Sequence, residues 1–218
     1  MNRKKIFELI EGGENLYVEF KQRFSSYEKI AKEMMAFANT RGGYLLIGVD
    51  DDKTIYGIES EKSDLELIEK TAREFIEPPV EYSTFVVPIK NKEILAVEIK
   101  ESNLKPHRLQ DYRQILDLNS ALVYVRINDK SVQASKEMIK LLQTQSSGVS
   151  LKNYSLGKNE KIVFEYLDKY ETITVKTLCK IANISERRAS RTLIKLVRAN
   201  ILLIHINDKG ESYFTYAG

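Results

Sequence analysis

The sequence predicts an α+β fold for the first two thirds of the chain, a mixed sheet flanked by helices, followed by a smaller helical domain with a hairpin. Three observations carry this prediction. Strand-like and helix-like hydrophobic periods alternate along residues 14–142. The polar stretch 143–150 (QTQSSGVS) is typical of a linker. The charge changes sign across it: residues 1–150 hold 22 Lys and Arg against 24 Asp and Glu, and residues 151–218 hold 12 against 7.

These observations divide the 218 residues into two domains of ordinary size. We expect a first domain over residues 1–146, a linker over 147–157 and a second domain over 158–218. The second domain is the basic one, and a basic domain favours a polyanionic partner.

A strand and a helix open the first domain. Residues 16–20 (LYVEF) alternate in polarity as a strand does. Ser25, followed three residues later by Glu28, is a capping-box pair that predicts the start of a helix. The glycine pair at 42–43 predicts where that helix stops. The largely apolar residues 44–50 (YLLIGVD) are then expected as a central strand.

The remainder of this domain continues the alternation of strands and helices. After a turn at 50–53, we expect strands at 54–58, 80–88, 94–99 and 121–127, and helices at 64–76 and 135–142. Many adjacent strands together with helices predict the α+β class.

The second domain is expected to contain three helices and a hairpin. Helical periodicity begins at Lys158. Thr174 is placed to cap a second helix that ends at Asn183, and Ser185 is placed to cap a third. The tail alternates as a hairpin around a turn at residues 207–210. This order is that of a winged helix-turn-helix domain.

The third of these helices has a cationic face. With about 100° of rotation per residue, its basic side chains fall within one arc and its apolar side chains on the opposite side. In helix-turn-helix proteins the corresponding helix enters the major groove, where arginine binds phosphate or guanine in a bidentate manner. The expected nucleic-acid-binding residues are Arg187, Arg188, Arg191, Lys195 and Arg198, with Lys209 at the hairpin tip. The alternatives are a solvated basic face without a partner and a surface that contacts protein.

Residues 19–58 (EFKQRFSSYEKIAKEMMAFANTRGGYLLIGVDDDKTIYGI) closely resemble the Schlafen/AlbA-type DNA-binding domain. The resemblance rests on a Glu-Phe-Lys strand, a helix ending in Ala-Phe-Ala-Asn-Thr-x-Gly-Gly, and Ile-Gly-Val-Asp-Asp. It continues in KPHR at 105–108 and YVRINDKSVQAS at 124–135, and so covers roughly residues 12–140. In bacterial members this domain is often followed by a winged helix, and such proteins are described as transcriptional regulators.

The same resemblance implies an enzymatic alternative. In animal Schlafen proteins a related domain cleaves RNA with three carboxylates, and the matching candidates here are Glu14, Glu19 and either Asp50 or Asp51. Clustered carboxylates can hold Mg²⁺ or Mn²⁺, which activates water. Because Glu14 and Glu19 are five residues apart, they converge only if Glu14 lies in the turn before the strand. Otherwise Glu19 pairs with a basic neighbour and the Asp run caps a turn. The candidate partners of Glu19 are Lys21, Arg23 and Arg41.

Other function classes lack their motifs. The sequence contains no G-x-x-x-x-G-K-[ST] phosphate loop and no G-x-S-x-G elbow, and its two histidines and single cysteine, Cys179, make no zinc set. We therefore expect no cofactor, except Mg²⁺ or Mn²⁺ under the nuclease alternative. No apolar run approaches the roughly 18–20 residues that cross a bilayer, and one cysteine fits a reducing compartment. These features predict a cytoplasmic protein without a membrane partner.

Together the observations predict a two-domain DNA-binding transcriptional regulator. Its expected partners are double-stranded DNA, with RNA as an alternative, and a second copy of the chain, because symmetric dimers read paired half-sites. The first domain is expected to oligomerise, to sense a ligand or to contact nucleic acid. The alternative is a metal-dependent ribonuclease that uses the Glu/Glu/Asp set, to which no catalytic role is otherwise assigned.

Overall fold

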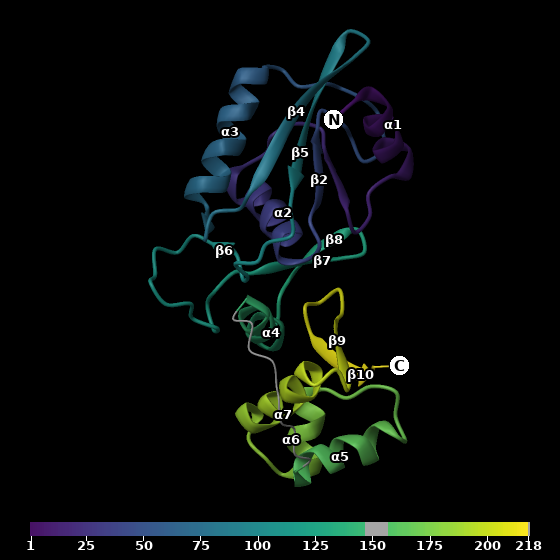
Figure 1. Cartoon of the computed structure of the whole chain (residues 1–218), viewed down its shortest axis with the longest axis vertical. Helices are drawn as coiled ribbons and strands as arrows, with labels where there is room; N and C mark the ends of the chain where they lie inside the picture. Colours follow the sequence, from purple (N-terminus) through teal and green to yellow (C-terminus); the bar gives the residue numbers. More distant parts are fainter. Residues whose placement is uncertain (147–156, 218) are drawn as a thin grey trace. The chain divides into compact units, whose positions relative to one another are not determined.

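The computed structural model describes residues 1–146 and 157–217. The chain divides into two compact units, Met1–Gln133 and Ala134–Gly218 (Figure 1). Each unit has its own hydrophobic core: two buried clusters lie in the first unit and one in the second.

The boundary between the units lies earlier than the sequence predicts. The expected linker at 147–157 falls almost entirely outside the described residues. The helix before it, α4 (Lys136–Ser146), was expected to close the first domain but groups with the second unit. The reason is a set of polar contacts with the last helix of that unit. Lys140 Nζ donates to Ser190 Oγ at 2.9 Å, and Ser190 Oγ donates to Glu137 Oε1 at 2.8 Å.

The first unit is built on a four-stranded mixed sheet, as the sequence predicts. Its strand order is β1-β2-β5-β4, with β1 parallel to β2 and the other two pairs antiparallel. The strands are β1 (Val18–Lys21), β2 (Gly43–Ile47), β4 (Tyr82–Ile89) and β5 (Lys92–Ile99). Strand β2 is therefore paired on both sides, which agrees with its nearly continuous apolar sequence.

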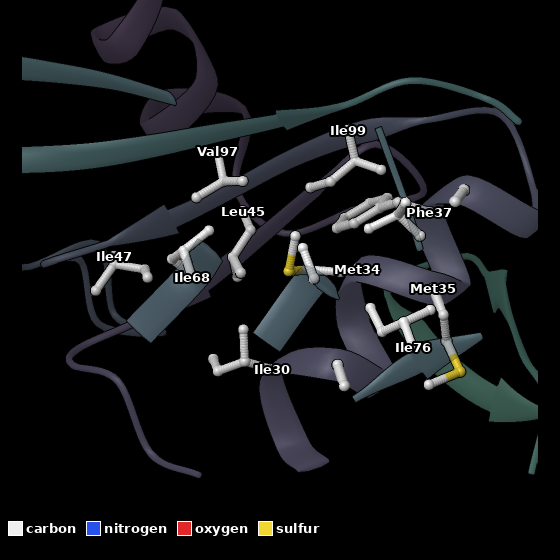
Figure 2. Packing of buried hydrophobic residues seen from close by; sticks show 14 of the residues in the cluster. Ile30, Met34, Met35, Phe37, Leu45, Ile47, Ile68, Ile76, Val97 and Ile99 are labelled. Carbon is white, nitrogen blue, oxygen red and sulfur yellow. The ribbon is translucent and has the colours of Figure 1, made fainter. Parts of the chain in front are cut away.

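Helices cover both faces of this sheet. The helices α2 (Tyr27–Asn39) and α3 (Glu61–Glu74) pack on one face and α1 (Arg3–Gly12) packs on the other. Adjacent residues of β2 show the division: Leu45 packs with the α2 and α3 cluster, and Leu46 packs with the α1 cluster. Figure 2 shows the first of these clusters, which includes Met34 and Phe37 of α2, Ile68 of α3, Leu45 of β2 and Val97 of β5.

Several details of the first unit differ from the sequence predictions. Helix α1 was not predicted. Helix α2 is capped by Ser26, whose side chain accepts from the backbone N–H of Lys29, and not by Ser25. Residues 54–58 form a loop rather than a strand, because the N–H groups of Tyr56 and Gly57 both donate to the carbonyl of Gly48.

Two short strand pairs complete the first unit. The strand predicted at 121–127 is β7 (Tyr124–Ile127), and the chain then returns as β8 (Lys130–Gln133), which pairs with β7. Both lie near the C-terminal end of α2 (Figure 1). The strands β3 (Ile76–Glu77) and β6 (Arg108–Leu109) form the other pair.

The second unit contains, after α4, three helices and a hairpin in the predicted order. These are α5 (Lys158–Leu167), α6 (Val175–Ala182), α7 (Glu186–Arg198), β9 (Leu202–Ile206) and β10 (Ser212–Tyr216). One apolar cluster joins all of these elements, and it includes Val163, Leu178, Leu193, Leu202 and Phe214. The antiparallel pairing of Phe214 with Ile204 fixes which face of the hairpin is buried.

Helix α2 packs closely against Gly43 at the start of β2. A Cβ atom added at Gly43 would lie 2.5 Å from Phe37 Cδ1 and 2.6 Å from the carbonyl oxygen of Tyr17. We expect Gly43→Ala to lower the free energy of unfolding by about 1–3 kcal/mol, the usual cost of overpacking, as measured by urea unfolding. Gly12→Ala is the control, since a Cβ there meets no atom within 4 Å. Equal unfolding midpoints for the two variants would contradict this packing.

Candidate functional site

The turn between α6 and α7 is made by the residues that the sequence predicts. Thr174 caps α6 by accepting from the backbone N–H of Thr177 at 3.1 Å. Asn183 ends α6 in the left-handed conformation, with φ of 49°. Ser185 then caps α7, where its side chain accepts from the backbone N–H of Arg188. Two local signals, a left-handed asparagine and a serine cap, thus place α7 directly after α6.

Helix α7 buries one face and exposes its arginines on the other. Ala189, Leu193 and Leu196 are fully buried in the core of the unit. Arg187, Arg188 and Arg191 are exposed. Within the described part of the chain, the guanidinium groups of these three arginines form no ion pair. The exposed face is therefore positively charged and open to a partner.

The other predicted basic residues are less open than these arginines. Lys195 Nζ lies 3.5 Å from Glu160 Oε1, and the Glu160 side chain is only 10% exposed. Arg198 is half-buried in the last turn of α7. Lys209 is exposed at the hairpin turn, where its N–H donates to Asn207 Oδ1 at 3.0 Å. The structure thus brings Lys195 and Arg198 onto the same helix as the arginines but engages Lys195 with a carboxylate.

Sequence reasoning missed the role of α4 beside this surface. Ser190 of α7 is 2% exposed because Glu137 and Lys140 of α4 hydrogen-bond it. Ser190 follows Arg187 by one turn of helix, so α4 borders the arginine face on one side. No local sequence pattern marks this contact, because the partners of Ser190 lie about fifty residues away in the chain.

Of the candidate acids in the first unit, Glu14, Glu19 and Asp51 lie close enough for their charges to interact. Glu14 lies in the turn before β1, as the odd spacing to Glu19 requires, and its Oε1 accepts from the backbone N–H of Phe20 at 2.8 Å. Burial raises the pKa of Glu14; the Phe20 bond opposes this shift, and the charges of Glu19 and Asp51 add to it. Asp50 instead serves the following turn, where its Oδ1 accepts from the N–H of Asp51 at 3.1 Å.

Both carboxylate oxygens of Glu19 are engaged by cations. Oε1 accepts from Lys21 Nζ, one of the partners that the sequence suggested. Oε2 accepts from Arg126 Nη1 at 2.7 Å, a contact that spans 107 positions in the chain. Glu33 on α2 also lies 3.3 Å from Arg126 Nη1 and accepts from the hydroxyl of Ser131. Glu19 is therefore part of a buried ion-pair network.

Arg126 is almost fully satisfied within this network. Its side chain is 0% exposed, and Nη2 donates to the carbonyl oxygens of Asn15 at 2.7 Å and Val18 at 3.3 Å. Its guanidinium carbon lies 4.7 Å from the centre of the Phe37 ring. Burying a charge in this way is tolerated only with such partners. Arg126 thus ties β7 to β1, to α2 and to the turn that carries Glu14.

Asn39 and His107 form a second buried polar cluster. The Asn39 amide donates to the carbonyls of His107 and Tyr124 and accepts from the His107 N–H at 2.7 Å. Asn39 therefore holds the loop that carries His107 in place. His107 Nδ1 lies 2.6 Å from the carbonyl oxygen of Pro78, whereas Nε2 is buried and has no partner among the described residues. Burial lowers the pKa of His107, and the charge of Lys105 lowers it further.

Two kinds of feature are absent from the described residues. Among residues 1–146 and 157–217, no three His, Cys, Asp or Glu side chains are grouped so that they could hold a metal ion. No helix in these same ranges is long and apolar enough to span a membrane.

The first unit matches a known family. The family model described as Schlafen, AlbA_2 aligns with residues 14–135, more than half of the chain. The chain belongs to the Schlafen AlbA_2 family. The match spans β1 to β8 and includes the acids, the buried Arg126 and the Asn39 cluster. Membership indicates a nucleic-acid-related function.

Two solved structures are similar to the chain. One is the solution structure of the N-terminal domain of a RecG-related protein, described as an ATP-dependent DNA helicase relative, from Nitrosomonas europaea. It is 23% identical, with a TM-score of 0.39, and the match covers 50% of this chain and 81% of that one. The other is the DIP2311 protein from Corynebacterium diphtheriae, 16% identical with a TM-score of 0.47. That match covers 99% of this chain but only 39% of the other.

Loss of Arg126 should destabilise the first unit severely. Arg126→Met leaves Glu19 and Glu33 buried without their shared cation, and we expect the free energy of unfolding to fall by about 3–5 kcal/mol in urea unfolding. Arg113→Met is the control, because Arg113 pairs with Asp117 at the surface and such pairs contribute about 0–1 kcal/mol. A similar small loss in both variants would show that the network is not a major source of stability.

The buried His107 should make stability depend on pH. The lowered pKa keeps folded His107 neutral where unfolded His107, at about 6.5, already binds a proton. The unfolded state therefore holds more protons, and the free energy of unfolding should fall as pH drops below about 6.5, by at most about 1.4 kcal/mol per pH unit. Urea unfolding between about pH 7 and pH 5 measures this slope. In His107→Gln the slope should be shallower, and an unchanged slope would exclude His107 as its source.

Proposed function

We propose that the chain is a DNA-binding transcriptional regulator whose second unit is a winged helix-turn-helix domain. The observation that carries the proposal is the exposed arginine face of α7, which follows a tight turn and precedes a hairpin. Helix-turn-helix proteins place the second helix of the motif in the major groove, and the hairpin beside it contacts the DNA backbone. In this chain α6 and α7 are the two helices of the motif and β9 and β10 are the wing.

The basic residues divide into different roles under this proposal. Arg187, Arg188 and Arg191 lie on the open face of α7 and are the residues that reach base edges or phosphates. Lys209 at the wing tip contacts backbone phosphate. Lys195 must exchange Glu160 for a phosphate, whereas Arg198 at the C-terminal end of α7 lies at the edge of the contact surface. Binding should therefore rest mainly on the three arginines.

The first unit supplies a second activity in this proposal. We propose that this unit oligomerises, senses a ligand or makes additional contacts with nucleic acid. We also propose that the whole chain acts in the cytoplasm. Pairing of two copies would place two α7 helices on successive half-sites of duplex DNA. A single small domain buries limited DNA surface, so a homodimer gives the affinity that one copy lacks.

The geometry does not favour the ribonuclease alternative, in which Glu14, Glu19 and Asp50 hold Mg²⁺ or Mn²⁺. Both oxygens of Glu19 already accept from cationic side chains, and Arg126 supports the fold through this contact. The acids whose charges act on Glu14 are Glu19 and Asp51, while Asp50 accepts a backbone hydrogen bond in its own turn. A metal ion would have to displace Arg126 or Lys21 from Glu19.

Removal of two arginines should weaken DNA binding without affecting the fold. We expect the Arg188→Ala, Arg191→Ala double variant to lose at least tenfold in affinity for duplex DNA at low salt, since each phosphate or base contact contributes about 1 kcal/mol or more. Fluorescence anisotropy with a labelled duplex measures this change. The control is Lys161→Ala, Lys169→Ala, which removes the same charge from exposed positions outside α7. If both double variants bind like the parent, α7 is not the DNA-binding helix.

A further inference from the structure

The first unit contains a pocket that the proposed regulator function does not use. It has a volume of about 580 Å³, within the range of small-molecule sites. It opens between the end of β1, the loop before α3 and the first turns of α3. The lining residues that matter here are Gln22, Phe24, Ile47, Tyr56, Asp64 and Leu67.

Backbone hydrogen bonds hold the loop that forms one wall of the pocket. The N–H groups of Tyr56 and Gly57 both donate to the carbonyl of Gly48, each at 2.9 Å. The N–H of Ile58 donates to the carbonyl of Glu93 on β5 at 2.8 Å. Gly57 has a φ of 84°, and a Cβ there would lie 3.0 Å from Lys92 Cβ. The loop that carries Tyr56 is thus fastened to the sheet, so the pocket is preformed.

Two of the polar residues that line the pocket are a buried carboxylate and a half-buried amide. Asp64 is 8% exposed, and its carboxylate accepts from the backbone N–H of Ser60. Burial raises the pKa of Asp64, the hydrogen bond from Ser60 opposes this shift, and the nearby charge of Glu59 adds to it. Within the described residues, the side-chain amide of Gln22 makes no hydrogen bond. Both groups therefore have capacity for a ligand.

The rest of the lining combines an apolar floor with exposed polar residues at the mouth, which are Arg23, Glu59, Ser60 and Ser63. Ile47 is fully buried and Phe24, Ile58 and Leu67 are half-buried, so the floor of the pocket is hydrophobic. Tyr56 lies on the rim, 49% exposed, with Lys92 Nζ 5.8 Å from the centre of its ring. An exposed aromatic ring beside an apolar floor is suited to a flat ring.

We propose that this pocket binds a single unstacked guanine base, with Asp64 accepting from its N1–H and N2–H groups, Gln22 as a further polar contact, and Tyr56 against its face. The inference rests on the proposed nucleic-acid function and adds a base-binding site on the first unit. Guanine is the base whose Watson–Crick edge presents two adjacent donors to a carboxylate. Adenine, cytosine and uracil each present one donor group there beside at least one acceptor, and an ionised Asp64 would repel that acceptor.

Titration calorimetry of the full chain with free nucleosides tests the proposal. We expect guanosine to bind more tightly than inosine, which lacks the 2-amino donor, by about tenfold, and adenosine to bind more weakly still. Asp64→Asn should reduce guanosine affinity by about tenfold or more, because an amide offers one acceptor and one donor. Tyr56→Ala should also weaken binding, and Tyr56→Phe should retain most of it.

The controls separate this proposal from the one on which it rests. Glu66→Gln removes the same charge from an exposed position of α3, where Glu66 lies 3.9 Å from Lys62, and it should bind guanosine like the parent. Circular dichroism confirms that the variants are folded. Equal affinity for the nucleosides, or guanosine binding unchanged in folded Asp64→Asn, would overturn the pocket proposal. If Asp64→Asn still binds duplex DNA, the proposed role of α7 stands, whether or not the pocket binds guanosine.

Discussion

A buried arginine is the interaction on which the first unit most depends. Arg126 on β7 contacts two carboxylates from different elements, Glu19 of β1 and Glu33 of α2, and the backbone carbonyl of Asn15. Desolvating a guanidinium costs several kcal/mol, so such a group persists in a core only when nearly every donor has a partner. The network fixes the turn with Glu14, the start of the sheet and the β7–β8 hairpin in one arrangement.

The two units direct their charges in opposite ways. In the first unit the most prominent acids face inward, where cations and backbone N–H groups engage them, and Asp64 faces a pocket. In the second unit the arginines of α7 face outward. The outward arginines of α7 are suited to the phosphates of a polyanion, whereas the pocket with Asp64 is suited to one small group with N–H donors. Under the two proposals, the chain has two different surfaces for nucleic acid.

Features that depend on neighbouring residues could be predicted from the sequence, and features that depend on distant contacts could not. Thr174, Asn183 and Ser185 act within a few residues of themselves, so the helix ends of the second unit were foreseen. The contact between Glu19 and Arg126 spans 107 positions, and no local pattern marks it. For the same reason the sequence does not show that α4 contacts α7, because Lys140 and Ser190 are fifty positions apart.

The pocket was equally hidden, because its lining comes from three separate segments. Gln22 follows β1, Tyr56 lies in a segment predicted as a strand, and Asp64 lies in the first turn of α3.

The central claim, that α7 carries the DNA contact, is tested most directly by nuclear magnetic resonance of the ¹⁵N-labelled full chain with a short duplex. The account predicts the largest amide shifts in residues 186–198 and 207–211. Shifts confined to Met1–Gln133 would contradict it.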